Sequence, residues 1–292
     1  MRVRFEYRSA LGRLLLPWIP FVLVIALYAK GSIDRHVENP KDKMMPNLSQ
    51  LADGLEFAIQ IRTPDGYRWD GWKDFHVFSR ESWKTVPEGW RMLLWEDTVA
   101  SLKRLSMGLG LSATLALLVG LHMGAFPVVE VVMLRFVGFF SFLPPLALLP
   151  LVFIYLGTGE VAKVAIVFLG TFFDLTQNIY LRILEVPDRY IFQSYAQGAS
   201  TWEVVYKICL VLKLPPILDS VRLAIRPGWV YLIAAELIAA EAGLGYRISL
   251  VQRSLQVNVI LWYILWIAFM GYLLDLMIRL LTRFAFPWAS KA

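Results

Sequence analysis

Few side chains in this sequence are suited to covalent chemistry. The 292-residue chain has one cysteine, Cys209, which excludes an internal disulfide framework and any metal site built from several thiolates. Its three histidines, His36, His76 and His122, lie far apart and lack the spacing of metal ligands. No grouping of serine, histidine and carboxylate that would indicate a catalytic centre is recognisable. The sequence therefore indicates a protein that is not catalytic by itself.

The ionisable side chains of greatest interest lie inside long apolar runs. Asp174, flanked by Thr171 and Gln177, falls near the middle of one run, and Glu236 lies in another. A charged group at membrane depth is costly, so it indicates a function or a specific partner. Arg226 precedes Glu236 by ten residues, too far for a pair on one helix, so the partner of Glu236 must lie on another helix. If both side chains lined a path through the membrane, two buried carboxylates would favour the passage of a cationic or hydrogen-bond-donating solute.

The composition places these groups in a membrane. Hydrophobic residues make up 58% of the chain and charged residues 18%, and the mean hydropathy is +0.56, which is too apolar for a water-soluble domain of this length. A helix that crosses a bilayer needs about 20 residues. Six apolar runs approach or exceed this length, and they are residues 14–29, 105–126, 131–156, 161–179, 218–240 and 257–281. We therefore expect an all-α membrane protein with six transmembrane helices.

The distribution of charge predicts the orientation of these helices. Residues 31–97 carry a net charge of −3, whereas the rest of the chain carries +9. Short cytoplasmic segments are enriched in lysine and arginine, and here the amino terminus and residues 182–222 are the most basic. Both termini are therefore expected in the cytoplasm and residues 31–97 outside. Because the basic residues flank apolar runs, no nucleic-acid partner is expected.

The first apolar run, 14–29, has two interpretations. A basic start followed by an apolar middle is typical of a secretory signal peptide, but no clear small-x-small cleavage site precedes Lys30. An uncleaved first span is therefore favoured. The predicted organisation is a cytoplasmic amino terminus and first helix over residues 1–30, an extracytoplasmic loop over 31–97, and a permeation core of five helices over 98–292.

The extracytoplasmic loop is expected to contain amphipathic helices at the membrane surface. Leu48, Leu51, Leu55 and Ile59 have helical spacing. Five tryptophans follow them, namely Trp69, Trp72, Trp83, Trp90 and Trp95. Tryptophan clusters of this kind are typical of the lipid headgroup region, although binding of a ligand or partner is an alternative.

A cytoplasmic segment, residues 182–213, carries the main functional signal and is called the coupling segment below. Ser200 and Glu203 have the S-x-x-E spacing of a capping box, which predicts two short helices that meet at Gly198. A segment of this kind can also be an inert helix lying on the membrane surface.

The wider pattern resembles the coupling motif of ABC-importer permeases, in which E-A-A is followed by three residues, G, nine residues and I-x-L-P. Nine residues separate Gly198 from Ile208, and Leu210 falls at the position of the motif leucine. Residues 192–194 read F-Q-S in place of E-A-A, and Val211 replaces the proline. These departures bear on the detailed contacts with an ATPase rather than on the role of the segment.

Other stretches are similar to the nitrate, sulfonate and taurine branch of that family. They are L-P-P-L-A-L-L-P at 143–150, L-G-T-G-E at 156–160, A-E-L-I-A-A at 235–240 and G-L-G-Y at 243–246. Together the similarity covers about residues 98–288. The long loop before it and the ending R-F-A-F-P-W resemble a subgroup described as urea-carboxylase-related.

The resemblance implies a subunit of a bacterial inner-membrane complex. Its partners would be ABC ATPase subunits that bind ATP and Mg, a second permease copy or close paralogue, an extracytoplasmic solute-binding protein and membrane lipids. The chain itself would bind no cofactor. It would move a small polar solute inward, either urea-like or guanidinium-like, or else nitrate, a sulfonate or taurine. The alternative is an ion-coupled secondary transporter, although no inverted repeat is recognisable in the sequence.

The resemblance and the spacing together assign the candidate site residues. Coupling to the ATPase is assigned to Gly198, Ala199, Ser200, Thr201, Trp202, Glu203, Val205 and Tyr206. Within this set, Trp202, Val205 and Tyr206 form the packed face, and Arg189 and Lys207 contact its rim. The translocation pathway is assigned to Pro144, Pro145, Asp174, Gln177 and Glu236. An outer gate loop is assigned to Gly243, Leu244 and Gly245.

Two of these assignments have a specific reason. Irregular backbone is tolerated within a membrane only where protein or water covers it, so Pro144 and Pro145 are expected to face the bundle interior, as is the stretch 226–228. For Glu236 we favour a hydrogen bond between helices over contact with the solute, because the family motif has a glutamate at this position.

Overall fold

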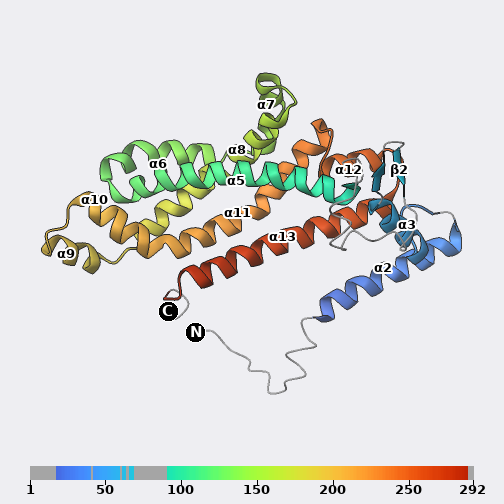
Figure 1. The fold of residues 1–292 in the computed structure, drawn as a ribbon, viewed down its shortest axis with the longest axis horizontal. Helices are drawn as coiled ribbons and strands as arrows, with labels where there is room; N and C mark the ends of the chain where they lie inside the picture. The colour runs from blue at the N-terminus through green and yellow to red at the C-terminus, as the bar shows by residue number, and fades with distance from the viewer. Residues whose placement is uncertain (1–17, 41, 60, 64–65, 69–90, 289–292) are drawn as a thin grey trace, which may run out of the picture.

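The computed structural model describes residues 18–288, apart from positions 41, 60, 64–65 and 69–90. Four long helices form the core, and they are α5 (Leu93–Ala125), α8 (Glu160–Leu184), α11 (Leu210–Ala239) and α13 (Val257–Ala285). Figure 1 shows them running along an elongated molecule. The short helices α9 and α10 lie at one end, whereas α3, α12 and the strands lie at the other.

Close contact between α5 and α8 depends on glycines. A Cβ atom added at Gly108 would lie 2.7 Å from Cβ of Val167, and one added at Gly124 would lie 2.6 Å from Cβ of Ile183. Small residues at such crossings let two helix backbones approach each other, as is common in membrane bundles. Gly108, the first residue of the sequence G-L-G-L-S-A-T at 108–114, therefore lets α5 approach α8 closely, in addition to being part of an apolar run.

Three helices in the described ranges are long and apolar enough to cross a membrane, namely α5, α8 and α13. The helix α2 (Ile19–Glu38) does not meet this criterion, because Lys30, Asp34 and Arg35 lie within it. The helix α11 also falls short, because charged residues from Lys213 to Glu236 interrupt its apolar surface. The number of six spans therefore stays a prediction, and the start of the first predicted span lies outside the described residues.

The third predicted span, 131–156, is not one straight helix. The helix α6 (Pro127–Ser141) ends before the short 3-10 helix η4 (Pro145–Leu148), and α7 (Leu149–Leu156) follows. The two halves are bent by 82°, so they form either a broken span or a re-entrant pair. Pro144 and Pro145 explain the break, because proline lacks an N–H group and disfavours helical backbone at the preceding residue.

The predicted loop of residues 31–97 contains the helix α3 (Leu48–Ala58), which begins with a capping box formed by Asn47 and Gln50. It also contains the strands β1 (Ile61–Thr63), β2 (Gly66–Arg68) and β3 (Arg91–Met92), paired antiparallel in the order β2-β1-β3. The helices on either side extend into this range, because α2 continues to residue 38 and α5 begins at residue 93. Trp95 is exposed on α5, and the other four tryptophans lie outside the described residues.

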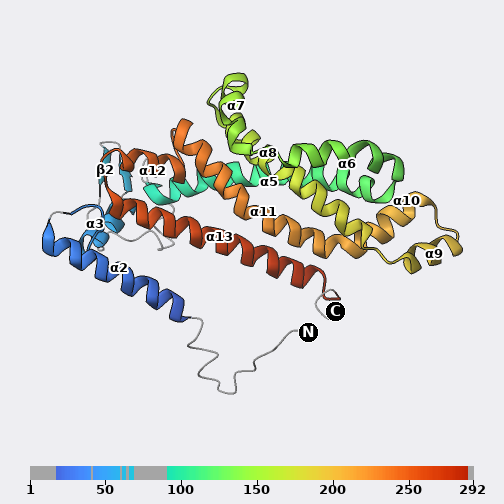
Figure 2. The same ribbon diagram turned by 180° about the vertical axis from the view of Figure 1, so that it is seen from behind.

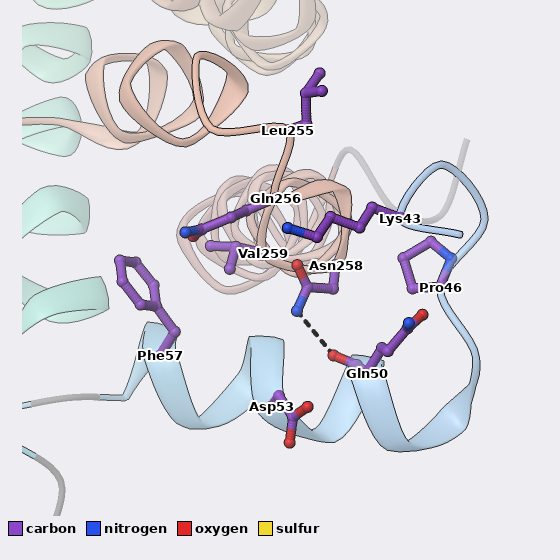
Figure 3. Close-up of a pocket in the computed structure, with 9 residues that line it drawn as sticks. All are labelled: Lys43, Pro46, Gln50, Asp53, Phe57, Leu255, Gln256, Asn258 and Val259. Atoms are coloured by element: carbon purple, nitrogen blue, oxygen red, sulfur yellow. Dashed lines mark hydrogen bonds between the residues drawn. The ribbon is translucent and has the colours of Figure 1, made fainter. Parts of the chain in front are cut away.

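The helix α3 packs on the start of α13, as both views show (Figures 1 and 2). The side-chain amide of Asn258 donates to the Gln50 carbonyl oxygen at 2.9 Å, and the Trp262 indole donates to the Leu51 carbonyl oxygen at 2.7 Å. A cavity of about 340 Å³ lies between α3 and the start of α13, together with the residues just before each helix (Figure 3). Its lining consists of Lys43, Pro46, Gln50, Asp53, Phe57, Leu255, Gln256, Asn258 and Val259.

Candidate functional site

The coupling segment contains the predicted pair of short helices. The helix α9 (Asp188–Ala196) ends just before Gly198, and α10 (Thr201–Glu203) continues through a π-helical turn, η5 (Val204–Cys209), into α11. Gly198 has a φ angle of +86°, in the left-handed region that glycine adopts without strain. Apart from its chain neighbours, no described residue has an atom within 4 Å of the position where its Cβ would be, so the backbone angle alone requires glycine.

The predicted capping box at Ser200 is present. The Ser200 hydroxyl accepts the Glu203 backbone N–H at 3.4 Å, and the Ser200 backbone N–H donates to the Glu203 carboxylate at 3.0 Å. Lys207 Nζ also lies 2.8 Å from Glu203 Oε1. The Lys207 hydrogen bond, followed by the bonds to Ser200, lowers the pKa of Glu203 to about 2. This stabilisation is fully present above the ordinary carboxyl pKa and is lost as the pH falls through about 2.

The exposed face of the coupling segment is aromatic. Phe192 is 69% exposed, Trp202 is 57% exposed, and Tyr195 and Tyr206 are also exposed. Val205 is different, because only 3% of its surface is exposed and it belongs to the main hydrophobic core of the chain. The prediction that Val205 forms part of a face toward a partner is therefore wrong, since its neighbours within the chain already cover it.

An aromatic cluster joins the coupling segment to the end of α5, and it consists of His122, Phe126, Trp202 and Tyr206. The Trp202 ring centre lies 5.2 Å from that of Phe126 and 6.1 Å from that of Tyr206. The Tyr206 hydroxyl lies 3.1 Å from His122 Nε2. Sequence reasoning could not single out His122 or Phe126, because both fall at the end of a predicted span and have no distinctive spacing.

Two predicted pathway residues lie on an exposed face of α8. Asp174 and Gln177 are exposed, and the Asp174 carboxylate makes no hydrogen bond or ion pair with any described residue. Arg226 of α11 is exposed as well, whereas Gly228 is buried. Since an uncovered charge is costly at membrane depth, this surface needs water or another protein chain against it.

The two pathway prolines do not lie in the interior of the single chain. Pro144 is exposed and Pro145 is half-buried at the bend between α6 and α7. The expected interior position is therefore not found among the helices of one copy. A bundle interior for these residues would require a second chain.

Glu236 is fully buried, and its partner lies on another helix, as the spacing predicted. Arg104 of α5 donates to Glu236 Oε1 at 2.6 Å, and the Ser101 hydroxyl lies 2.8 Å from both carboxylate oxygens. Glu236 therefore links helices within the chain, and it does not line an exposed path. Arg104 balances the charge of Glu236. Only Asp174 is therefore left as a carboxylate that could favour a cationic solute.

The predicted gate residues form a tightly held turn at the start of α12 (Leu244–Gln252). The backbone N–H groups of Gly243, Leu244 and Gly245 donate to side chains at 3.0, 2.9 and 2.9 Å. The acceptors are Asp97, Ser101 and Glu236, in that order. Side chains of α5 and α11 thus satisfy N–H groups that a helix start leaves without partners.

Further charged residues surround this turn. Arg247 pairs with Asp97 at 2.9 Å, and the Tyr263 hydroxyl donates to the same carboxylate at 3.0 Å. Arg104 also pairs with Glu160 at 2.6 Å. Sequence reasoning missed Asp97, Arg104 and Arg247, because each lies near the end of an apolar run, where charges usually mark only the membrane boundary.

Comparison with known proteins identifies the family. Residues 112–291 match the family model described as binding-protein-dependent transport system inner membrane component. The chain belongs to this family. It is therefore a multi-pass inner-membrane permease component of the ABC importers, as the resemblance of the sequence implied.

Curated relatives agree with this assignment. The chain is 34% identical to the taurine transport system permease protein TauC of Escherichia coli (strain K12) over 198 residues, which cover 68% of this chain and 72% of that protein. It is 31% identical to the putative aliphatic sulfonates transport permease protein SsuC of Bacillus subtilis (strain 168), over 65% of this chain and 69% of that protein. It is 26% identical to the bicarbonate transport system permease protein CmpB of Synechocystis, over 67% and 70%.

A solved structure supports the fold. A chain of the MetNI methionine ABC transporter, in an inward-facing conformation, aligns with a TM-score of 0.52 at 19% identity. The alignment covers 64% of this chain and 95% of that chain. The predicted all-α class and ABC-importer permease fold are therefore confirmed, and the residues before position 97 add the small sheet.

Proposed function

We propose that this chain is the membrane subunit through which an ABC importer moves a small polar solute inward, while a partner subunit binds Mg and hydrolyses ATP. The observation that carries the proposal is the coupling segment. There, a left-handed glycine precedes a capped helix start and aromatic side chains remain exposed. Apolar surface of this kind at a polar end of a protein marks an interaction site. Gly198, Trp202 and Tyr206 are the residues we assign to ATPase coupling with most support, together with residues 199–201 and 203.

The charge distribution supports an orientation with both termini and the coupling segment in the cytoplasm. The coupling segment and α3 lie at opposite ends of the molecule, which fits a position on opposite sides of a membrane (Figure 1). In this arrangement residues 1–30 form the amino terminus and first span, 31–97 form an extracytoplasmic insertion, and 98–292 form the core with five spans. A solute-binding protein would then approach the end that carries α3 and α12.

A second permease copy, identical or paralogous, is the proposed cover for the exposed polar surface of α8. Asp174 and Gln177 cannot face lipid at low cost, whereas a water-filled path between two copies would accommodate them. The bend at Pro144 and Pro145 would line the same path. Membrane lipids would cover the remaining apolar surface.

We propose a small sulfonate-type or related anionic or zwitterionic solute, because the curated relatives are named for taurine, aliphatic sulfonates and bicarbonate. A urea-like or guanidinium-like solute is the second candidate, and Asp174 favours it, because a carboxylate can pair with a planar guanidinium through two hydrogen bonds. Both candidates are small and strongly polar, so one competition assay can compare them.

The test is copurification and reconstituted uptake. The chain, co-expressed with an ABC ATPase and a solute-binding protein from the same cell, should copurify with the ATPase. In vesicles the complex should take up taurine, a sulfonate or guanidine only when ATP is supplied on the ATPase side. Uptake by the chain alone, driven by an ion gradient, would establish the secondary-transporter alternative and refute the proposal.

A further inference from the structure

The hydrogen bond between His122 and Tyr206 connects two parts of the chain that are distant in sequence. His122 Nδ1 lies 2.6 Å from the Leu118 carbonyl oxygen, 3.1 Å separates His122 Nε2 from the Tyr206 hydroxyl, and 84 positions separate the two residues. A carbonyl oxygen only accepts hydrogen bonds, so Nδ1 carries the proton. Nε2 of the neutral ring is then free to accept from Tyr206. The hydrogen bond to the Leu118 carbonyl oxygen within α5 therefore orients the His122 ring, so that Nε2 can accept a hydrogen bond from the coupling segment.

The surrounding rings hold the same two parts together. The His122 ring is stacked on Phe126, with 5.9 Å between the ring centres, and its edge faces Trp202. Trp202 and Tyr206 are stacked at an interplanar angle of 16°. Trp202 and Tyr206 are exposed, so this cluster lies at the surface and contributes little to the core.

The cluster also lies at a change of chain direction. Phe126 is the first residue after α5 and the N-cap of α6, and its extended backbone has φ −122° and ψ 114°. The chain links the coupling segment covalently to α8 and α11 only. Through the aromatic cluster it gains a separate contact with α5 and with the start of α6.

The opposite end of α5 holds the turn before α12. Asp97 and Ser101 accept the N–H groups of Gly243 and Leu244, and Arg104 donates to the Ala242 carbonyl oxygen at 2.7 Å. About 30 Å of continuous helix separates Ser101 from His122, at 1.5 Å per residue. One rigid helix thus contacts the coupling segment at one end and the predicted gate at the other.

We propose that His122 is a positioning residue that ties the coupling segment to α5, so that movement of the coupling segment reaches the turn at residues 242–245. This inference rests on the proposed function, since it concerns how ATP hydrolysis on a partner opens and closes the path. Movement can also pass through α8 and α11. Removal of the bond between His122 and Tyr206 weakens the link between α5 and the coupling segment, while the ring contacts of the cluster remain.

The test removes the hydrogen bond and keeps the rings. Tyr206→Phe removes the donor, and His122→Phe removes the acceptor. Tyr272→Phe is the matched control, because it removes an exposed hydroxyl on α13, outside the cluster and outside the coupling segment. In reconstituted vesicles, each cluster variant should raise the number of ATP molecules hydrolysed per solute by about fivefold, the effect of one ordinary hydrogen bond. The double variant should be no worse than either single variant, because both remove the same interaction.

A second measurement follows the turn itself. Glu241→Cys, in a Cys209→Ala background, places a thiol on an exposed position beside residues 242–245. Its labelling rate should differ between the nucleotide-free and ATP-trapped complexes, and Tyr206→Phe should abolish this difference. Restoration of the normal ATP ratio by His122→Gln, whose amide oxygen can accept from Tyr206, would support a role for the bond itself.

The outcomes separate this inference from the proposed function. If the unaltered complex shows no ATP-driven uptake, the proposed function fails and this inference fails with it. If the unaltered complex transports and both cluster variants keep its ATP ratio and its labelling difference, only the inference is overturned. Reduced assembly with an unchanged ratio would also overturn it, because the bond would then have a purely structural role.

Discussion

Arg104 and Glu236 form a buried ion pair with 2.6 Å between Nη1 and Oε1, although 132 positions of sequence separate them. The other guanidinium nitrogens of Arg104 bind Glu160 at 2.6 and 2.7 Å. Lys163 also pairs with Glu160 at 3.1 Å. The four charges sum to zero, and release of Glu160 from Arg104 would leave two neutral pairs. Arg104 and Glu160 can therefore separate without leaving a buried charge unpaired.

Replacement of Glu236 by glutamine should destabilise the protein strongly. The amide keeps the shape but removes the charge opposite Arg104, and breaking a buried pair in this way costs about 3 kcal/mol. The measurement is the midpoint of thermal unfolding of the purified protein in detergent. Glu185→Gln is the control, because Glu185 is about half exposed and pairs with Arg182 and Lys213 near the surface, where an ion pair contributes less than about 1 kcal/mol. Equal shifts for both variants would contradict the central role of Glu236.

Gly243→Ala should also lower the unfolding midpoint. Gly243 has a φ angle of +130°, and an added Cβ would lie 2.6 Å from Glu236 Oε1. The backbone strain alone costs about 1–3 kcal/mol. Gly110→Ala serves as the control, since Gly110 lies within α5 and no atom of another helix in the described part of the chain lies within 4 Å of its added Cβ. That control should be neutral or stabilising, because alanine favours a helix, so a neutral Gly243→Ala would show that the turn is loosely held.

The sequence was sufficient to predict the helical class and the capping box at Ser200, because each depends on local patterns. The break near Pro144 was expected as an interruption, but its size of 82° was not. The partner of Glu236 could be placed on another helix but not identified as Arg104. That identification requires the packing of α5 against α11, which sequence spacing within one helix does not contain.

The misassignment of Val205 has a similar origin. In a short helix the exposed and buried faces depend on which neighbours cover it, and here the core of the chain covers Val205 and leaves Trp202 exposed. The π-helical turn at Val204–Cys209 further alters the spacing that a regular helix would have. The small sheet was missed because β1, β2 and β3 are only two or three residues long.

Gly198→Ala should weaken binding of the ATPase more than it weakens the fold. The φ angle of +86° costs alanine roughly 1–2 kcal/mol, but the site is open and no core contact is lost. Copurification of the ATPase should fall, while the unfolding midpoint should fall less than it does for Gly243→Ala, where a steric clash adds to the backbone strain. Gly198→Asn should retain more ATPase than Gly198→Ala, because asparagine tolerates left-handed backbone. The reverse order would show that backbone geometry at residue 198 is not what the partner requires.

Phe192→Ala should affect binding of the ATPase, whereas Val205→Ala should affect the stability of the fold. Phe192 is 69% exposed and stands where the coupling motif has its glutamate, so its loss should reduce ATPase copurification and leave the unfolding midpoint unchanged. Val205 is buried, so its truncation should lower stability by about 2 kcal/mol and leave the exposed face intact. Similar losses of ATPase from both variants would argue that the exposed face is not the docking surface.

Asp174→Asn tests the charge of the solute. The carboxylate is exposed on α8 and has no partner among the described residues, so the amide should assemble normally with the ATPase and unfold at the same temperature. If guanidine is the solute, its uptake should fall by at least about tenfold, since a charged hydrogen bond contributes roughly 1.5–3 kcal/mol. If taurine or another sulfonate is the solute, its uptake should fall less or rise, because the carboxylate repels the sulfonate group. Leu181→Ala, two turns further along α8 and also exposed, controls for a general disturbance of this face. Unchanged uptake of every solute in Asp174→Asn would remove Asp174 from the pathway.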